Sequence, residues 1–82
     1  MEETFSAVVE ADGITIVMER RYNGALSNCE PSMSIALPTE GAFGLTWLAN
    51  AIEAKGFRVE SAWAIKPTQN GLQMTAVVSE IA

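Results

Sequence analysis

The stretch FSAVVEADGITIVMERRY, residues 5–22, decides the fold that we predict for this chain. Two runs rich in apolar residues flank Asp12-Gly13, a pair that readily supplies the positive φ angles of a type I′ turn. A loop of these two residues would place Val9 opposite Ile16. One face of the hairpin would then be apolar, with Phe5, Ala7, Val9, Ile14, Ile16 and Met18. A slip of one residue would mix this set with the polar set, so the sequence specifies a hairpin with defined faces.

The residues after this hairpin predict a loop and then a third strand. NGALSNCEP, residues 23–31, is rich in turn-forming residues and is expected to be a loop. SMSIAL, residues 32–37, alternates between apolar and small residues, with Met33, Ile35 and Leu37 on one face. This alternation is typical of a strand with one side buried.

The stretch GAFGLTWLANAIEAKG, residues 41–56, predicts a helix over residues 40–55. Thr39 suits the N-cap, and Gly56 suits a left-handed stop after the last turn. The side that faces the sheet would carry Gly41, Gly44, Leu45, Leu48, Ala51 and Ile52. A glycine costs about 1 kcal/mol relative to alanine inside a helix. We expect close approach of the helix backbone to the sheet to offset that cost.

The last part of the chain, residues 57–82, predicts a second hairpin about Asn70-Gly71. Its apolar side would carry Phe57, Val59, Trp63, Ile65, Leu72, Met74, Ala76 and Val78. Ser61 and Glu80 also fall on this side, and a bulge or a sheet edge would explain them. The element order is therefore ββ-β-α-ββ. The expected fold class is α+β, a single mostly antiparallel sheet of about five strands with one helix packed on one face. We expect one domain, residues 1–82, because the chain is short.

Charge and residue content exclude several functional classes. The net charge is −5, and the only basic cluster is Arg20 to Tyr22, so nucleic-acid binding is not expected. The chain has no histidine, which removes the commonest general base and the usual zinc ligand. Its one cysteine, Cys29, has no second thiol to pair with. We therefore expect no catalytic residue, no metal and no cofactor.

Targeting signals are also missing from the sequence. The acidic start MEETFSAVVEADG has no basic segment followed by an apolar one, as a signal peptide would. The longest strongly apolar run, residues 41–52, is well short of the roughly 20 residues that span a bilayer. The expectation is a soluble, cytoplasmic protein without membrane contact.

A hydrophobic content of 49% is high for so short a chain and indicates burial against a partner. Phe43 and Trp47 lie four residues apart on one flank of the predicted helix, either in a partner interface or over the margin of the core. Arg20, Arg21 and Tyr22 form a second candidate surface. Alternatively, these arginines are solvated and pair with nearby glutamates. The second face of the sheet, with Val8, Val17, Ala36, Ala62, Ala64, Val77 and Ile81, is a third candidate.

The function expected from these features is that of a small accessory domain without enzymatic activity, which binds itself as a homodimer or higher oligomer, or binds another protein. An inhibitor or adaptor of phage or bacterial type is an example. The alternative is a small-molecule module, with a cleft between helix and sheet. Its lining would be Trp47, Trp63, Gly41 and Gly44.

Overall fold

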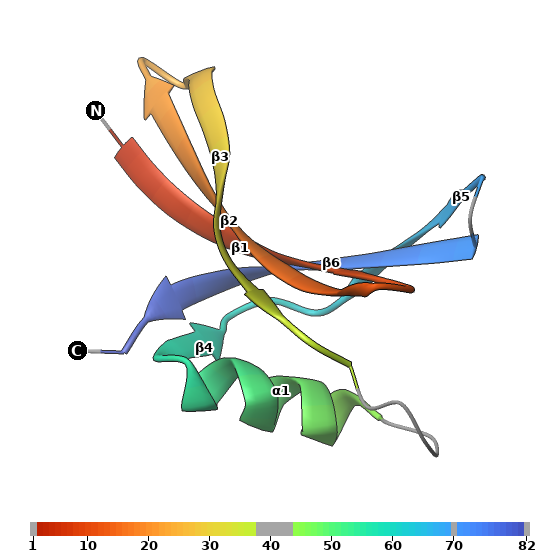
Figure 1. Cartoon of the computed structure of the whole chain (residues 1–82). Helices are drawn as coiled ribbons and strands as arrows, with labels where there is room; N and C mark the ends of the chain where they lie inside the picture. Colours follow the sequence, from red (N-terminus) through yellow and green to blue (C-terminus); the bar gives the residue numbers. More distant parts are fainter. Residues whose placement is uncertain (1, 38–43, 70, 82) are drawn as a thin grey trace.

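The computed structural model describes residues 2–37, 44–69 and 71–81. Over these residues the elements are β1 (Glu2–Glu10), β2 (Gly13–Tyr22), β3 (Ala25–Ile35), α1 (Leu45–Ala54), β4 (Phe57–Val59), β5 (Ala64–Thr68) and β6 (Gly71–Glu80). The strands form one antiparallel sheet in the order β3-β2-β1-β6-β4, and β5 also pairs with β6. Helix α1 lies along one face of it (Figure 1). The predicted α+β class fits this architecture, with six strands in the described residues rather than about five.

The first hairpin forms with the predicted faces but with a different register. Val9 pairs with Ile14, and Glu10 pairs with Gly13, so the loop consists of Ala11 and Asp12. The predicted loop of Asp12 and Gly13, with Val9 opposite Ile16, is therefore wrong. The shift is two residues, and side chains alternate with a period of two, so every side chain keeps its predicted face.

The third strand is longer than predicted, because residues 25–31 are part of it. The expected loop over residues 23–31 is wrong: β2 and β3 form a tight hairpin in which Tyr22 pairs with Ala25. Asn23 and Gly24 make the turn, with φ values of +53° and +83°. A type I′ turn needs positive φ at both central residues, and Asn-Gly supplies them at low cost. The predicted strand over residues 32–37 ends early, at Ile35, but its alternation is as expected, with Met33, Ile35 and Leu37 packed against the core.

The helix is shorter than predicted and begins at Leu45. Gly44 is its N-cap, with extended backbone angles, and an added Cβ there would meet no atom within 4 Å. The idea that Gly44 lies inside the helix and allows close contact with the sheet is therefore wrong. Thr39, Glu40, Gly41 and Phe43 lie outside the described residues. At the other end Gly56 has φ +92°, as a left-handed stop requires.

The second hairpin is interrupted between β4 and β5. Val59 pairs with Val78, and Ala64 pairs with Thr75. Between these two pairs, residues 60–63 lie opposite only two residues of β6, 76 and 77. The sequence predicts a bulge or a sheet edge at Ser61, and this interruption, with two extra residues on one side, is of the first kind. The Ser61 hydroxyl accepts a hydrogen bond from the Val77 backbone N–H at 2.9 Å and so replaces a strand carbonyl.

We expect Ser61→Ala to lower the free energy of unfolding by about 0.5–1.5 kcal/mol, because a sheet N–H loses its acceptor. Urea unfolding at fixed protein concentration measures the change. Ser27→Ala is the matched control, since both serines are exposed but the Ser27 hydroxyl donates its hydrogen bond, to the Arg20 carbonyl, whereas the Ser61 hydroxyl accepts one from a sheet N–H. Equal losses for the two variants would argue against a structural role for Ser61 in the bulge.

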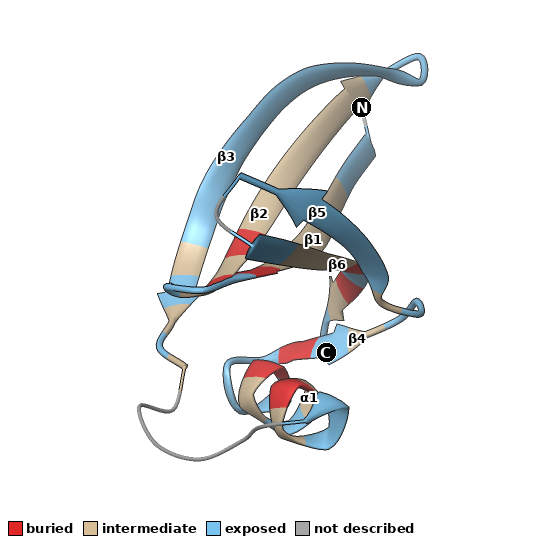
Figure 2. Cartoon of the chain, turned by 90° about the vertical axis from the view of Figure 1, so that its right-hand side faces the viewer, coloured by how far each residue is buried: buried red, intermediate tan, exposed pale blue. Residues whose placement is uncertain are grey.

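The core lies between the helix and the covered face of the sheet. Among the described residues, the buried side chains are all apolar: Ala7, Val9, Ile14, Ile16, Leu48, Ile52, Phe57, Ala76 and Val78. They come from the predicted faces of both hairpins and from the helix. Leu45, at the first position of α1, departs from the predicted helix stripe, because 57% of its surface is exposed. Figure 2 shows that the buried residues gather in the lower half of the molecule, near the helix.

Candidate interaction surfaces

The arginines of β2 are held by neighbouring carboxylates. Arg20 Nε lies 3.3 Å from Glu3 Oε2, and Arg21 Nη2 lies 3.1 Å from Glu19 Oε2. Successive residues of a strand point to opposite faces, so the two ion pairs lie on different sides of the sheet. Arg20, Arg21 and Tyr22 therefore do not form one basic patch. Tyr22 is 54% exposed beside the turn of the β2–β3 hairpin.

The tryptophans lie at the margin of the core. Trp47 and Trp63 are half-buried, and both pack against the buried cluster that contains Leu48 and Val78. This position agrees with the alternative in which the flank of the helix completes a small core. Phe43, the predicted neighbour of Trp47, lies outside the described residues. An interface role for the two aromatics stays a prediction.

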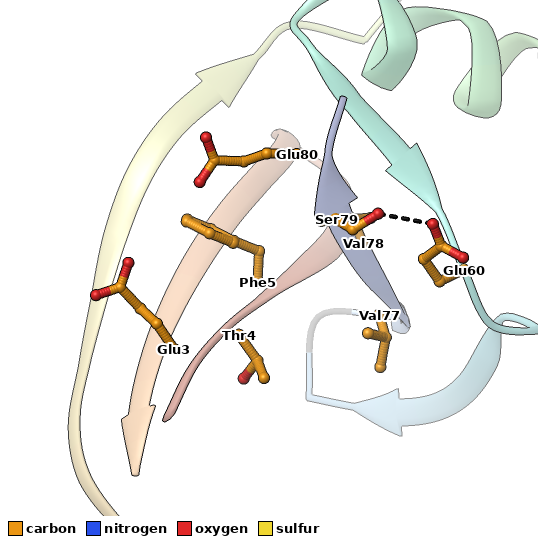
Figure 3. A pocket seen from close by; sticks show the side chains of 8 residues that line it. All are labelled: Glu3, Thr4, Phe5, Glu60, Val77, Val78, Ser79 and Glu80. Atoms are coloured by element: carbon orange, nitrogen blue, oxygen red, sulfur yellow. Dashed lines mark hydrogen bonds between the residues drawn. The ribbon is translucent and has the colours of Figure 1, made fainter. Parts of the chain in front are cut away.

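A hollow of about 360 Å³ opens where β1 and β6 separate (Figure 3). The pairing of β1 with β6 covers Phe5 to Val9, so residues 2–4 diverge from the end of β6. The hollow is lined by Glu3, Thr4, Phe5, Glu60, Val77, Val78, Ser79 and Glu80. Two of its carboxylates already have partners. Glu60 accepts a hydrogen bond from the Ser79 hydroxyl at 2.6 Å, and Glu3 pairs with Arg20.

The second hollow, also about 360 Å³, lies beside the β1–β2 turn and the end of β3. Its lining includes Gly13, Thr15 and Ser34. Neither hollow is lined by Trp47, Trp63 or Gly44, the described residues of the predicted ligand cleft, and Gly41 lies outside the described residues. In the described part of the chain, no group of three acidic, cysteine or histidine side chains is arranged to hold a metal ion.

Comparisons with known protein families, curated proteins and solved structures found no match for this chain. Its function has therefore to be argued from its own residues. Over the described residues, no helix has the length and apolar character needed to cross a membrane.

The second face of the sheet is a mixture of valines and small polar residues. Val17 and Val77 lie opposite Ser6 on either side, while Thr15 and Thr75 lie opposite Val8. Val8 and Val17 are half-buried, and Val77 is 48% exposed. Hydroxyl groups thus break the apolar area of this face into single side chains. Scattered exposed valines of this kind are common on solvated surfaces.

Among the described residues, the large apolar side chains with the highest exposed fraction lie in the β5–β6 hairpin. Ile65 and Leu72 expose 63% and 65% of their surfaces. Pairing of Ile65 with Met74 and of Pro67 with Leu72 puts all four on the face that carries the core. The sequence places Ile65 and Leu72 on this face, but it does not reveal their exposure. Met74 pairs with Val9, near the end of β1, so the hairpin continues past its neighbour and past the helix (Figure 1).

Two outer strands of the sheet, β3 and β5, are poorly suited to strand addition. β3 contains Pro31 and two register irregularities, and β5 contains Pro67. Proline has no backbone N–H to donate, and bulges twist an edge away from a flat partner strand. Binding at these edges through main-chain hydrogen bonds is therefore disfavoured, and contact through side chains is favoured.

Proposed function

We propose that this chain is a non-enzymatic domain that works by binding protein, and that its partner is a second copy of itself. The observation that carries this proposal is the size of its exposed surface, 5528 Å². A compact monomer of 8.8 kDa exposes roughly 4,800 Å², from the scaling of surface with mass. The chain therefore exposes roughly 700 Å² more than a compact monomer of its mass, which is what a subunit with an uncovered interface would show.

The overall dimensions support the same proposal. The radius of gyration is 13.0 Å, whereas a compact domain of this length has about 12 Å. The molecule is thin, with extents of 43 × 34 × 20 Å. A thin sheet with a single helix over the described residues buries few side chains, and small domains gain stability from association.

The small-molecule alternative has less support. The hollow between β1 and β6 is lined by three glutamates. Two of them already interact with side chains of the chain itself, Glu3 with Arg20 and Glu60 with Ser79. Trp47 and Trp63, which would have stacked on a ligand, instead pack against the core. No further observation favours a ligand of a particular chemical class.

Sedimentation velocity over a wide range of protein concentration tests the proposal. We expect a reversible shift from monomer towards dimer as concentration rises, with the dimer as the main species at the upper end. The buffer should contain a reductant, because the exposed Cys29 thiol could otherwise cross-link two copies. A species that remains monomeric at every concentration would overturn self-association.

A further inference from the structure

We infer that the apolar side of the β5–β6 hairpin is the surface through which two copies of this chain associate, each hairpin packing against that of its partner. This inference rests on the proposed self-association and assigns it to one surface. The contact side consists of Ile65, Pro67 and Leu72, with the half-buried Met74 at its inner end. The exposed colour of β5 and of the start of β6 in Figure 2 marks this hairpin as uncovered.

The hairpin carries little charge. Between Glu60 and Glu80 the only charged residue is Lys66, in a protein with a net charge of −5. Two acidic copies repel each other wherever their carboxylates approach, and buried like charges oppose association strongly. Lys66 pairs with Gln73, on the face opposite to Ile65 and Leu72. The proposed contact therefore brings no carboxylate against another.

The local structure of the hairpin also favours a packed partner. Residues 71–73 of β6 precede Met74, the first residue of this strand that pairs with β1. Beyond that point the sheet consists of β5 and β6 alone, and an isolated two-stranded ribbon is marginally stable in water. Covering its apolar side with an identical ribbon adds the second layer that it lacks.

A second copy is the occupant that the observations favour. The chain exposes roughly 700 Å² more surface than a compact monomer of its mass, and the contact side of the hairpin carries no charged residue, so it can pack against a copy of itself. A two-fold contact uses the same patch on both copies, so each side chain contributes twice. Proline in β3 and β5 disfavours strand addition at those two edges and favours contact through side chains.

The test compares two leucines at the tips of two tight hairpins. Leu72→Asp places a charge in the proposed contact, and Leu26→Asp places it on the β2–β3 hairpin, where Leu26 is 53% exposed. The two hairpins project at opposite ends of the molecule (Figure 1). We expect Leu72→Asp to raise the dimer dissociation constant at least about 100-fold, as disruption of a central apolar contact does. Leu26→Asp should leave the constant within about threefold of the unchanged protein.

Sedimentation velocity in reducing buffer measures both constants, and circular dichroism verifies that each variant is folded. If Leu72→Asp does not fold, Ile65→Gln serves as the second variant, with the same direction of effect. A wild-type dimer that Leu72→Asp does not weaken would overturn the assigned surface and leave self-association standing. Equal weakening by Leu26→Asp would also overturn the assignment. A wild-type chain that is monomeric throughout would overturn the proposed function itself.

Discussion

Leu48→Ala is expected to lower the free energy of unfolding by about 2–5 kcal/mol, the range for leucine truncation in a protein core. Leu48 is 1% exposed and joins the helix to the cluster formed by Ile14, Ile16 and Val78. A domain of this size has only a small total stability, so the variant should be partly unfolded at room temperature. Urea unfolding followed by circular dichroism, at one protein concentration, gives the difference.

Leu45→Ala is the matched control, because it is the same substitution in the same helix. Leu45 is 57% exposed, so the change should stay within about 0.5 kcal/mol, as is usual for surface sites. The pair also tests the corrected boundary of α1. A loss at Leu45 as large as that at Leu48 would mean that both leucines face the sheet, as the sequence pattern had predicted.

The second large effect is expected at the first turn. Gly13→Ala should lower the free energy of unfolding by about 2–5 kcal/mol, through strain and overpacking together. Gly13 has φ +150°, and an added Cβ would lie 2.8 Å from the Ile35 backbone oxygen. That oxygen belongs to the end of β3, which pairs with β2 beside this point. Relief of the contact would therefore displace the strand and not just a side chain.

Gly24→Ala is the control that separates the cost of backbone strain from the cost of a steric clash between the added Cβ and a neighbouring strand. Gly24 also has a positive φ, +83°, but an added Cβ would meet nothing within 4 Å. We expect a loss of about 1–2 kcal/mol from strain alone. Thermal unfolding of both variants at the same concentration gives the comparison. If Gly13→Ala costs no more than Gly24→Ala, close packing of Gly13 against β3 is refuted.

The faces of the hairpins could be predicted from sequence, but their registers could not. Apolar residues with a period of two place Ala7, Val9, Ile14 and Ile16 on one face, and all four are buried. A shift of two residues preserves that pattern, so the pattern cannot distinguish the predicted pairing of Val9 with Ile16 from the observed pairing with Ile14. In the observed turn, the backbone of Gly13 lies against the end of β3, a contact between distant segments that the local pattern does not contain.

The extension of β3 was missed although its signal was present. Asn23-Gly24 is the strongest kind of short hairpin signal, but the many turn-forming residues after it indicated a loop. Residues 25–31 have low strand propensity, and they become a strand because β2 pairs with them along its whole length. Pairing to a neighbour thus outweighs local propensity, as is common in sheets.

The structure adds more to the description of the candidate surfaces than to the predicted fold. Arg20 and Arg21 could be placed on opposite faces from sequence, but their carboxylate partners depended on the pairing of β1 with β2. The exposure of Ile65 and Leu72 had no signal in the sequence, because their pattern is that of core residues. Exposure depends on how far the neighbouring strand and the helix extend over them.

By itself, the sequence determined the order of the hairpins and the helix, the apolar face of each hairpin and the left-handed stop at Gly56 that follows the helix. These features depend on residues close together in the chain, through side-chain alternation and the backbone freedom of glycine. Only the tertiary structure decided the strand order, the break between β4 and β5, and which apolar side chains stay uncovered. Those features depend on which segments meet in space, and the pairing of distant strands is fixed by the whole set of contacts at once.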